Sequence, residues 1–163
     1  MGPAVGYSAT VAVIDADLKR FLEPDRVVSV GTCSDELMPN GVRGWGPKVS
    51  GDGTSVLLFI DRPAAAEAVT NLRDNGRIAA CFVDVITLRS VQVKGRCVEV
   101  GDPSAEDWPA IEHHRLGFSE AVETLGYPKH IMRNLWSTQV VKVRFVVEQI
   151  FDQTPGPGAG KPL

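Results

Sequence analysis

The sequence lacks the features of a membrane-spanning or disulfide-stabilised protein. No uncharged apolar run approaches the roughly 20 residues that a bilayer span needs, and residues 1–14 contain no basic segment of the signal-peptide type. The 3 cysteines are odd in number and form no CxxC pair, which disfavours a disulfide framework. We therefore expect a cytoplasmic protein whose cysteines are reduced, buried and structural, with no membrane partner.

Several other functional signatures are also missing. The 17 Lys and Arg residues against 20 Asp and Glu give a net charge of −3, so the basic surplus typical of nucleic-acid binding is absent. There is no GxGxxG, GxxxxGK[ST], HExxH or GxSxG motif. His113 and His114 are adjacent on an expected helix, where their side chains diverge by about 100°, and His130 stands alone. We expect these histidines at the surface and predict neither a metal site nor a nucleic-acid partner.

The length and composition favour one soluble domain. The chain has 163 residues, of which 44% are hydrophobic and 23% charged, close to the average for globular domains. A chain of this size buries enough surface to form its own core. We expect one domain over residues 1–152, followed by a Pro/Gly-rich tail, 153–163, that does not pack regularly.

The order of hydrophobic patterns predicts strands in runs, separated by helices. Strands are expected at 27–33, 42–49, 55–61, 77–84, 88–100 and 139–151, and helices at 15–23, 63–75, 102–125 and 128–136. The turn signal Pro39-Asn40-Gly41 is expected to join the first two strands. Strands in runs favour antiparallel pairing, so the predicted class is mainly β with peripheral helices (α+β). Six strands at this length close most economically as a small barrel.

The first segment with candidate chemistry is RGWGPK, in which two cations flank a tryptophan between glycines. Arg43 and Lys48 can bind a phosphate or carboxylate, and Trp45 offers a flat apolar surface. A spacing of five puts the cations on opposite faces of a regular strand, and a bulge at Gly46-Pro47 would bring them to one face. The alternative is an edge strand twisted by glycine, with both cations in solvent.

The second segment is LRSVQVKGR, an alternating strand. Ser90, Gln92 and Lys94 are expected on one face. If this face lines a crevice, it offers hydrogen-bond donors to the polar edge of a planar ligand. The alternative is a polar face that simply contacts water.

Together with LLFIDRPAAAEAVTNLRDNGRIAACF, these segments resemble the pyridoxamine 5′-phosphate oxidase-like family of FMN-binding split barrels. The resemblance extends from about residue 15 to residue 151. It implies a six-stranded antiparallel split barrel of the FMN-binding type, and a homodimer with two FMN sites at the subunit interface.

The resemblance also implies which residues hold the cofactor. The strand cations and Arg62 are expected near the flavin phosphate, the glycine–tryptophan backbone beside the isoalloxazine ring, and the second segment at the polar edge of the flavin. The eight implied contacts are Arg43, Gly44, Trp45, Gly46, Lys48, Arg62, Ser90 and Gln92. On this basis, replacing Arg43 or Lys48 with alanine should weaken FMN binding more than riboflavin binding.

Two departures from the family pattern change the expectation. Ala66-Glu67-Ala68 stands where FMN-binding members commonly have Ser/Thr-Arg-Lys, so we expect weakly bound FMN. Replacing Glu67 with Arg and Ala68 with Lys should then tighten binding by about tenfold or more. The tail does not match the substrate-binding C-terminus of the true oxidase, so oxidation of vitamin B6 is not expected.

The sequence leaves three functions open. The first is an FMN-dependent oxidoreductase acting on a small molecule, in which the flavin supplies the chemistry and no general acid or base is assigned. The second is a non-catalytic sensor or scavenger built on the same barrel. The third keeps the barrel and binds haem or a deazaflavin, for which the three histidines give little support.

Overall fold

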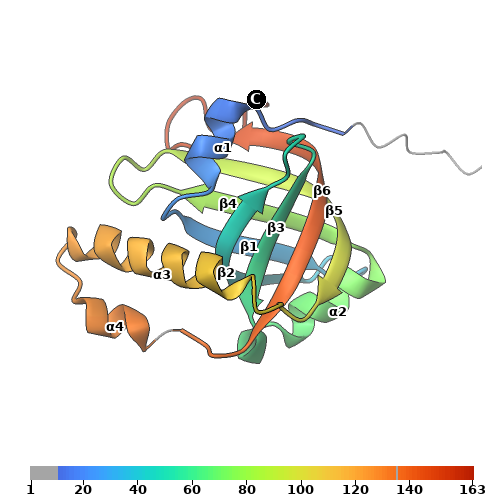
Figure 1. Ribbon diagram of the computed structural model, residues 1–163. Coiled ribbons are helices and arrows are strands. Elements are labelled where there is room, and N and C mark those ends of the chain that lie inside the picture. Colours follow the sequence, from blue (N-terminus) through green and yellow to red (C-terminus); the bar gives the residue numbers. More distant parts are fainter. Residues whose placement is uncertain (1–10, 135) are drawn as a thin grey trace, which may run out of the picture.

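The computed structural model describes residues 11–134 and 136–163 and shows a closed antiparallel barrel (Figure 1). The strand order is β1-β2-β3-β6-β5-β4, and β4 pairs with β1 to close the barrel. The strands are β1 (Val27–Cys33), β2 (Pro39–Val49), β3 (Ser55–Asp61), β4 (Arg77–Val83), β5 (Ser90–Gly101) and β6 (Val140–Asp152). The helices are α1 (Ala16–Leu22), the 3₁₀ turn η1 (Arg62–Ala64), α2 (Ala66–Asp74), α3 (Trp108–Glu123) and α4 (Lys129–Arg133). The predicted fold class is confirmed.

One predicted turn is wrong. Pro39-Asn40-Gly41 begins β2 instead of forming the turn, because Pro39 pairs with Cys33 and Gly41 with Gly31. The chain reverses earlier, where the amide of Ser34 donates to the carbonyl of Met38 at 3.0 Å. The hydrogen bonds of the long β1–β2 ladder stabilise the structure more than a local turn at Pro-Asn-Gly would.

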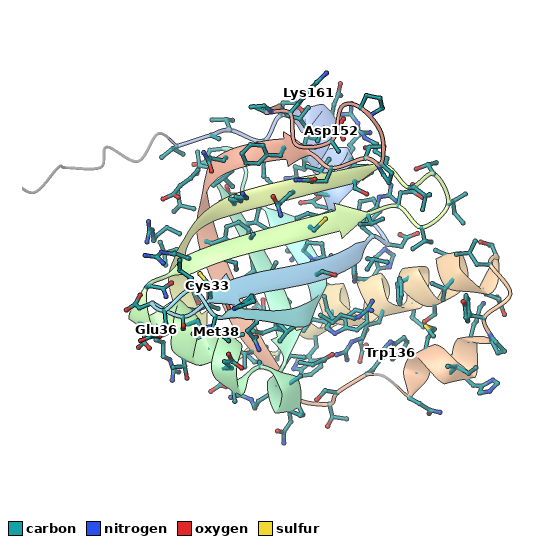
Figure 2. All side chains as sticks on the ribbon, turned by 180° about the vertical axis from the view of Figure 1, so that it is seen from behind. Cys33, Glu36, Met38, Trp136, Asp152 and Lys161 are labelled. Atoms are coloured by element: carbon teal, nitrogen blue, oxygen red, sulfur yellow. The ribbon has the colours of Figure 1, made fainter. Side chains whose placement is uncertain are left out.

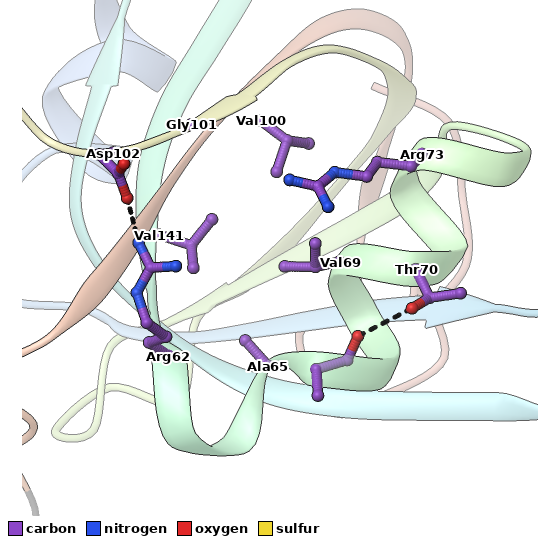
Figure 3. Close-up of a pocket in the computed structure, with 10 residues that line it drawn as sticks. Arg62, Ala65, Val69, Thr70, Arg73, Val100, Gly101, Asp102 and Val141 are labelled. Carbon is purple, nitrogen blue, oxygen red and sulfur yellow. Dashed lines mark hydrogen bonds and ion pairs between the residues drawn. The ribbon is translucent and has the colours of Figure 1, made fainter.

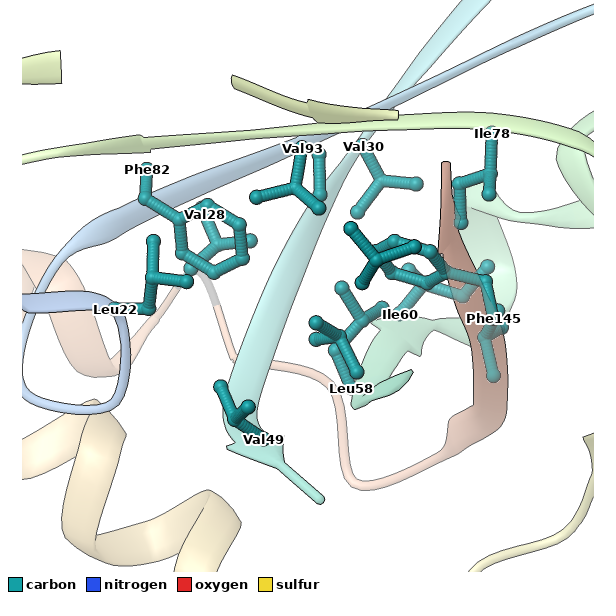
Figure 4. Packing of buried hydrophobic residues seen from close by; sticks show 14 of the residues in the cluster. Leu22, Val28, Val30, Val49, Leu58, Ile60, Ile78, Phe82, Val93 and Phe145 are labelled. Atoms are coloured by element: carbon teal, nitrogen blue, oxygen red, sulfur yellow. The ribbon is translucent and has the colours of Figure 1, made fainter. Parts of the chain in front are cut away.

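The barrel interior is apolar and tightly packed. Alternate residues along each strand point inward, so side chains such as Val30, Phe82 and Phe145 meet in one cluster (Figure 4). Gly44 also faces inward, and a Cβ on it would lie 2.7 Å from a methyl carbon of Val28. Glycine at this position therefore makes room for the core.

Helices cover the two ends of the barrel and one side. Leu22 of α1 and Leu72 of α2 join the interior cluster from opposite ends (Figure 1). On the outside, α3 lies against β2, and its Ile111 and Phe118 form one apolar cluster with Phe59 of β3. This second apolar cluster lies outside the barrel wall, and we call the surface beneath α3 the covered face.

The opposite side of the barrel has no such helix among the described residues. Figure 2 shows β1, β4 and β5 running across the front of the molecule without a helical layer. We call the outward surface of these three strands, with the adjoining outward residues of β2, the open face.

The C-terminal tail folds back along β6. Pro162 forms a β-bridge with Phe151, and the amide of Leu163 donates to the carbonyl of Ile150 at 2.9 Å. The carbonyl of Lys161 accepts from Asp152 at 2.9 Å. The tail forms no helix or strand of its own, and this isolated bridge and these hydrogen bonds hold it against the end of β6.

Within the described parts of the chain, no helix combines the length and the apolarity needed to cross a lipid bilayer.

Candidate functional site

β2 contains the bulge that the sequence left open between Trp45 and Lys48. Trp45 pairs with Phe59 and Lys48 with Leu57, so three residue steps along β2 lie opposite two residue steps along β3. Arg43 and Lys48 are consequently both exposed on the outside of the barrel. The two cations do not share one surface, however, because Gly46 between them contacts α3.

The backbone beside Trp45 is covered by α3. Trp45 is only 1% exposed, and its indole Nε1 donates to Oδ2 of Asp61 at 2.9 Å. Gly46 has a φ of 53°, and a Cβ there would lie 3.2 Å from the backbone of Ile111. Trp45 and Gly46 therefore hold α3 in place, and a flavin beside this strand would require α3 to move.

A buried ion pair lies at the same interface. Nη2 of Arg115 donates to Oδ1 of Asp61 at 3.0 Å, and the arginine side chain is 5% exposed. The guanidinium lies over the rings of Trp45 and Trp136, at 5.1 and 5.8 Å from their centroids. Burial lowers the pKa of Arg115, and the neighbouring Asp61 carboxylate opposes this effect. The pair thus fixes α3 to the end of β3.

The sequence led us to expect His114 at the surface, but this expectation is wrong because the side chain is buried. It is 3% exposed on the buried face of α3, in an edge-on arrangement with Trp45 at a ring-centroid distance of 6.0 Å. Burial lowers its pKa from the usual 6.5 to about 4, although the Asp25 carboxylate acts in the opposite direction. Among the described residues, no three His, Cys, Asp or Glu side chains are grouped to hold a metal ion.

The open face carries a row of outward residues that crosses four strands. Arg43 pairs with Ser29, Ser29 with Cys81, and Cys81 with Gln92. Directly opposed residues in antiparallel strands point to the same side of a sheet. The row therefore brings Arg43 of β2 and Gln92 of β5 to one surface, with only small side chains between them.

The open face is locally basic although the chain is acidic overall. β1, β2 and β4 contain no Asp or Glu, and the first carboxylate on β5 is Glu99. Among the described residues, Arg43, Arg77 and Lys94 have no carboxylate within 4.0 Å. These three cations therefore have no carboxylate partner on this side of the barrel, although the Arg43 guanidinium also lies over the rings of Trp45 and Phe118.

A shallow pocket lies within this basic surface. It has a volume of about 490 Å³, and Thr32, Arg77, Ala79, Gln92 and Lys94 are among the residues that line it. A pocket of this size is typical of small-molecule and cofactor sites. Sequence reasoning missed Arg77 and Lys94 as site residues. The lack of acidic residues in these strands could have indicated them, but only once the strand order shows that the strands are neighbours.

Ser90 lies at the margin of the open face and is buried. Its hydroxyl donates to the carbonyl of Leu88 at 2.9 Å, and its amide donates to the hydroxyl of Thr154 at 3.0 Å. Two residues further along β5, the side-chain Nε2 of Gln153 donates to the side-chain Oε1 of Gln92 at 3.4 Å. The tail therefore forms one border of the open face and covers Ser90.

Arg62 lies elsewhere. It follows β3, forms an ion pair with Asp102, and donates to the carbonyl of Val140 at 3.2 Å. Of the eight residues implied by the resemblance, Arg43 and Gln92 share the open face, and Ser90 lies under its border. Gly44 is in the barrel core, Trp45 and Gly46 lie under α3, and Lys48 and Arg62 are outside the open face.

The closed six-stranded barrel with helical ends and one uncovered side defines the class of split-barrel proteins. The family model described as pyridoxamine 5′-phosphate oxidase matches residues 14–147. The chain belongs to this family.

Solved structures agree on the fold. HupZ from Group A Streptococcus has 19% identity and a TM-score of 0.54, with 90% of this chain and 99% of that chain covered. A putative pyridoxamine 5′-phosphate oxidase from Lactobacillus delbrueckii has 14% identity and a TM-score of 0.53, covering 85% and 93%. An F420 reductase has 13% identity and a TM-score of 0.52, covering 81% and 94%. A comparison with curated protein sequences finds no match.

Proposed function

We propose that the chain binds FMN on the open face and acts as a flavin-dependent oxidoreductase on a small molecule. The observation that supports this most strongly is the composition of that face. A floor of small residues is bordered by three cations that have no carboxylate partner among the described residues, and β1, β2 and β4 contribute no carboxylate. A planar anionic ligand matches such a surface in both shape and charge.

The floor suits a flavin ring. Ser29, Ala79 and Cys81 have small outward side chains and Gly31 has none, so a planar ring can approach the strand backbones. Crossing from β2 to β5 spans three strand spacings, or about 14 Å. The carboxamide of Gln92 can both donate and accept hydrogen bonds at the pyrimidine edge of a flavin.

The phosphate end is then expected near Arg43. Glu67 brings an opposing charge to this strand, because its Oε2 accepts from Nδ2 of Asn40 at 3.2 Å, three residues before Arg43 and on the opposite face of β2. This carboxylate supports the proposal that FMN binds weakly. The double substitution suggested by the sequence is unsuitable, since Ala68 is 0% exposed and a lysine there would enter the core. Glu67 alone is the position to change.

We also propose that a second copy covers the open face. Bound FMN would supply the hydride or electron chemistry, and the protein's part is to hold the ring and exclude water. One chain leaves the face open to solvent, so the same face of another copy, or its tail border, completes the site. Light scattering should give twice the 17.6 kDa of one chain. A monomer at micromolar concentration would contradict this part of the proposal.

The test of the proposed function is a flavin titration with matched variants. The purified protein should shift the absorbance bands and change the fluorescence of added FMN relative to the free flavin. Arg43→Ala should weaken FMN binding by about tenfold or more, because a charge-assisted contact to phosphate is lost, and riboflavin binding much less. Lys48→Ala is the control, since Lys48 lies beyond the α3 contact on the same strand.

Each outcome separates the hypotheses. Equal losses for Arg43→Ala and Lys48→Ala would place the flavin over β2, with α3 displaced. A protein that changes neither the absorbance bands nor the fluorescence of added FMN would contradict the proposal and leave a non-catalytic role or a different cofactor. Reduction of bound FMN by a nicotinamide cofactor, followed by reoxidation by an acceptor, would support the oxidoreductase assignment.

A further inference from the structure

We propose that a second pocket, beside α2, is a binding site for a small molecule that carries a carboxylate or phosphate on an apolar body. This α2 pocket lies between α2 and the ends of β3, β5 and β6, and has a volume of about 370 Å³. Arg62 and Arg73 are its cationic lining residues, and Asp102 is its acidic one. Neither the family nor the open face assigns it a role.

Two arginines reach the α2 pocket from separate elements. Arg62 follows β3 and Arg73 is in the last turn of α2, and Figure 3 shows both guanidinium groups directed toward the space between them. Among the described residues, Arg73 has no carboxylate within 4.0 Å. Two guanidinium groups on one pocket can bind the oxygens of a single carboxylate or phosphate.

Asp102 occupies part of this anion position in the unliganded chain. Its carboxylate pairs with Arg62, and its side chain is 84% exposed. An ion pair this exposed contributes little to stability. The anion of a ligand can therefore replace Asp102 beside Arg62 at little cost in free energy. Arg62 remains anchored during the exchange by its hydrogen bond to the carbonyl of Val140. Asp102 therefore acts as an internal competitor for the site.

The floor of the α2 pocket is apolar. Val69 of α2, Val100 of β5 and Val141 of β6 lie between the two arginines (Figure 3). Inorganic phosphate alone would leave this floor in water. The lining therefore favours an anion attached to a hydrocarbon or aromatic group, which would cover the valines while its charged end meets the arginines.

The α2 pocket is separate from the open face. The pockets on the two surfaces share no lining residue. Helix α2 stands between them, with Thr70 and Arg73 on the side of the α2 pocket and Asn71 on the other side, where its amide donates to Thr32 at 3.1 Å. A ligand in the α2 pocket can therefore bind with or without FMN on the open face.

The test uses the whole chain and simple probes. Phenyl phosphate and phenylacetate are titrated while the amide signals of Gly101 and Thr70 are followed by NMR, with inorganic phosphate as the probe that lacks an apolar body. We expect saturable shifts with at least one aromatic anion, and about tenfold weaker binding in Arg73→Ala because a charge-assisted contact is lost. Asp102→Asn should tighten binding about threefold. Arg20→Ala, an exposed arginine of α1, is the control and should change nothing.

The results that would overturn the proposal are distinct from those that would overturn FMN binding. Absence of saturation by either aromatic anion, or equal affinity in Arg73→Ala and Arg20→Ala, would show that the α2 pocket is not an anion site. An FMN affinity that falls in Arg73→Ala in parallel with that for phenyl phosphate would show that it holds the flavin phosphate instead. An FMN affinity that is unchanged in Arg73→Ala supports two sites. Failure of the protein to bind FMN at all would leave the phenyl phosphate result intact.

Discussion

The covered face and the open face are built from the same barrel wall, and they differ in the size of their outward side chains. Beneath α3, the outward residues of β2 and β3 include Trp45, Leu57 and Phe59, all buried. On β1 and β4, the corresponding positions include Ser29 and Cys81. A large outward residue needs a covering element within the chain, whereas a small one leaves a surface that another molecule can cover.

The covered face mainly stabilises the fold, whereas the open face is the surface on which we propose ligand binding. The covered face contributes apolar burial and a buried ion pair, and both depend on α3. The open face contributes unpaired cations and a pocket, which add little to the folding of one chain. Substitutions on the first face should change the free energy of unfolding, and substitutions on the second should change ligand binding.

The largest expected effect is on the covered face. Trp45→Ala should lower the free energy of unfolding by about 3–5 kcal/mol, because it removes a fully buried aromatic side chain and leaves a cavity beneath α3. Ser29→Ala on the open face should change it by less than about 0.5 kcal/mol. Urea denaturation of both variants measures the contrast, and similar losses for the two would abolish the distinction between the faces.

The next largest effect is a pH dependence that arises under α3. The pKa of buried His114 is about 4 and that of an exposed histidine is 6.5, so the unfolded chain binds a proton first as the pH falls. Stability from this residue is complete above pH 6.5 and decreases down to about pH 4, by up to about 3 kcal/mol.

His114→Phe should remove this part of the pH dependence, since it keeps a ring against Trp45 without the titrating group. His113→Gln is the matched control, because His113 is exposed on the same helix. Unfolding curves between pH 4 and pH 7 measure the slope. A slope that survives in His114→Phe would assign the titration to another group.

Two ion pairs give the third contrast. Asp61→Asn should cost about 2 kcal/mol or more, because it leaves the Arg115 guanidinium buried without a counter-charge. Asp102→Asn breaks the exposed pair with Arg62 and should cost less than about 1 kcal/mol. Thermal unfolding distinguishes the two, and an equal cost would mean that α3 does not shield the Asp61–Arg115 pair from water.

The smallest effect is on the open face. Glu67→Arg should tighten FMN binding about threefold, because it reverses an exposed charge beside Asn40, three residues from Arg43. Asp74→Arg makes the same charge change at the other end of α2 and should have no effect. Fluorescence titration at low and high salt measures both. Equal tightening in the two variants would indicate a general charge effect in place of a local one.

Much of the barrel could be predicted from the sequence because strand alternation is a local signal. The bulge in β2 was also predictable, since Gly46-Pro47 interrupts the ladder. The turn at Pro39–Gly41 was not, because its outcome depends on pairing with β1.

The site was harder to predict because it depends on what covers each strand. The sequence marks Trp45 as a flat surface but does not show that α3 buries it. Likewise, His114 looks solvated on its helix until α3 is placed against β2. The sequence also does not show that Arg43 and Gln92 lie on one face, because this depends on the register of β1 and β4 between them.

The most direct test of the central claim places a bulky side chain on the floor of the open face. Ala79 faces outward between Gly31 and Lys94, so Ala79→Trp should leave the barrel folded and weaken FMN binding by about tenfold or more. Val98→Trp, at an exposed position of β5 outside the pocket, is the control and should bind FMN as the unmodified chain does. Flavin fluorescence titration of the two variants, with circular dichroism to verify the fold, decides the matter. An unchanged FMN affinity in a folded Ala79→Trp variant would contradict the account, because the flavin would then lie somewhere other than the open face.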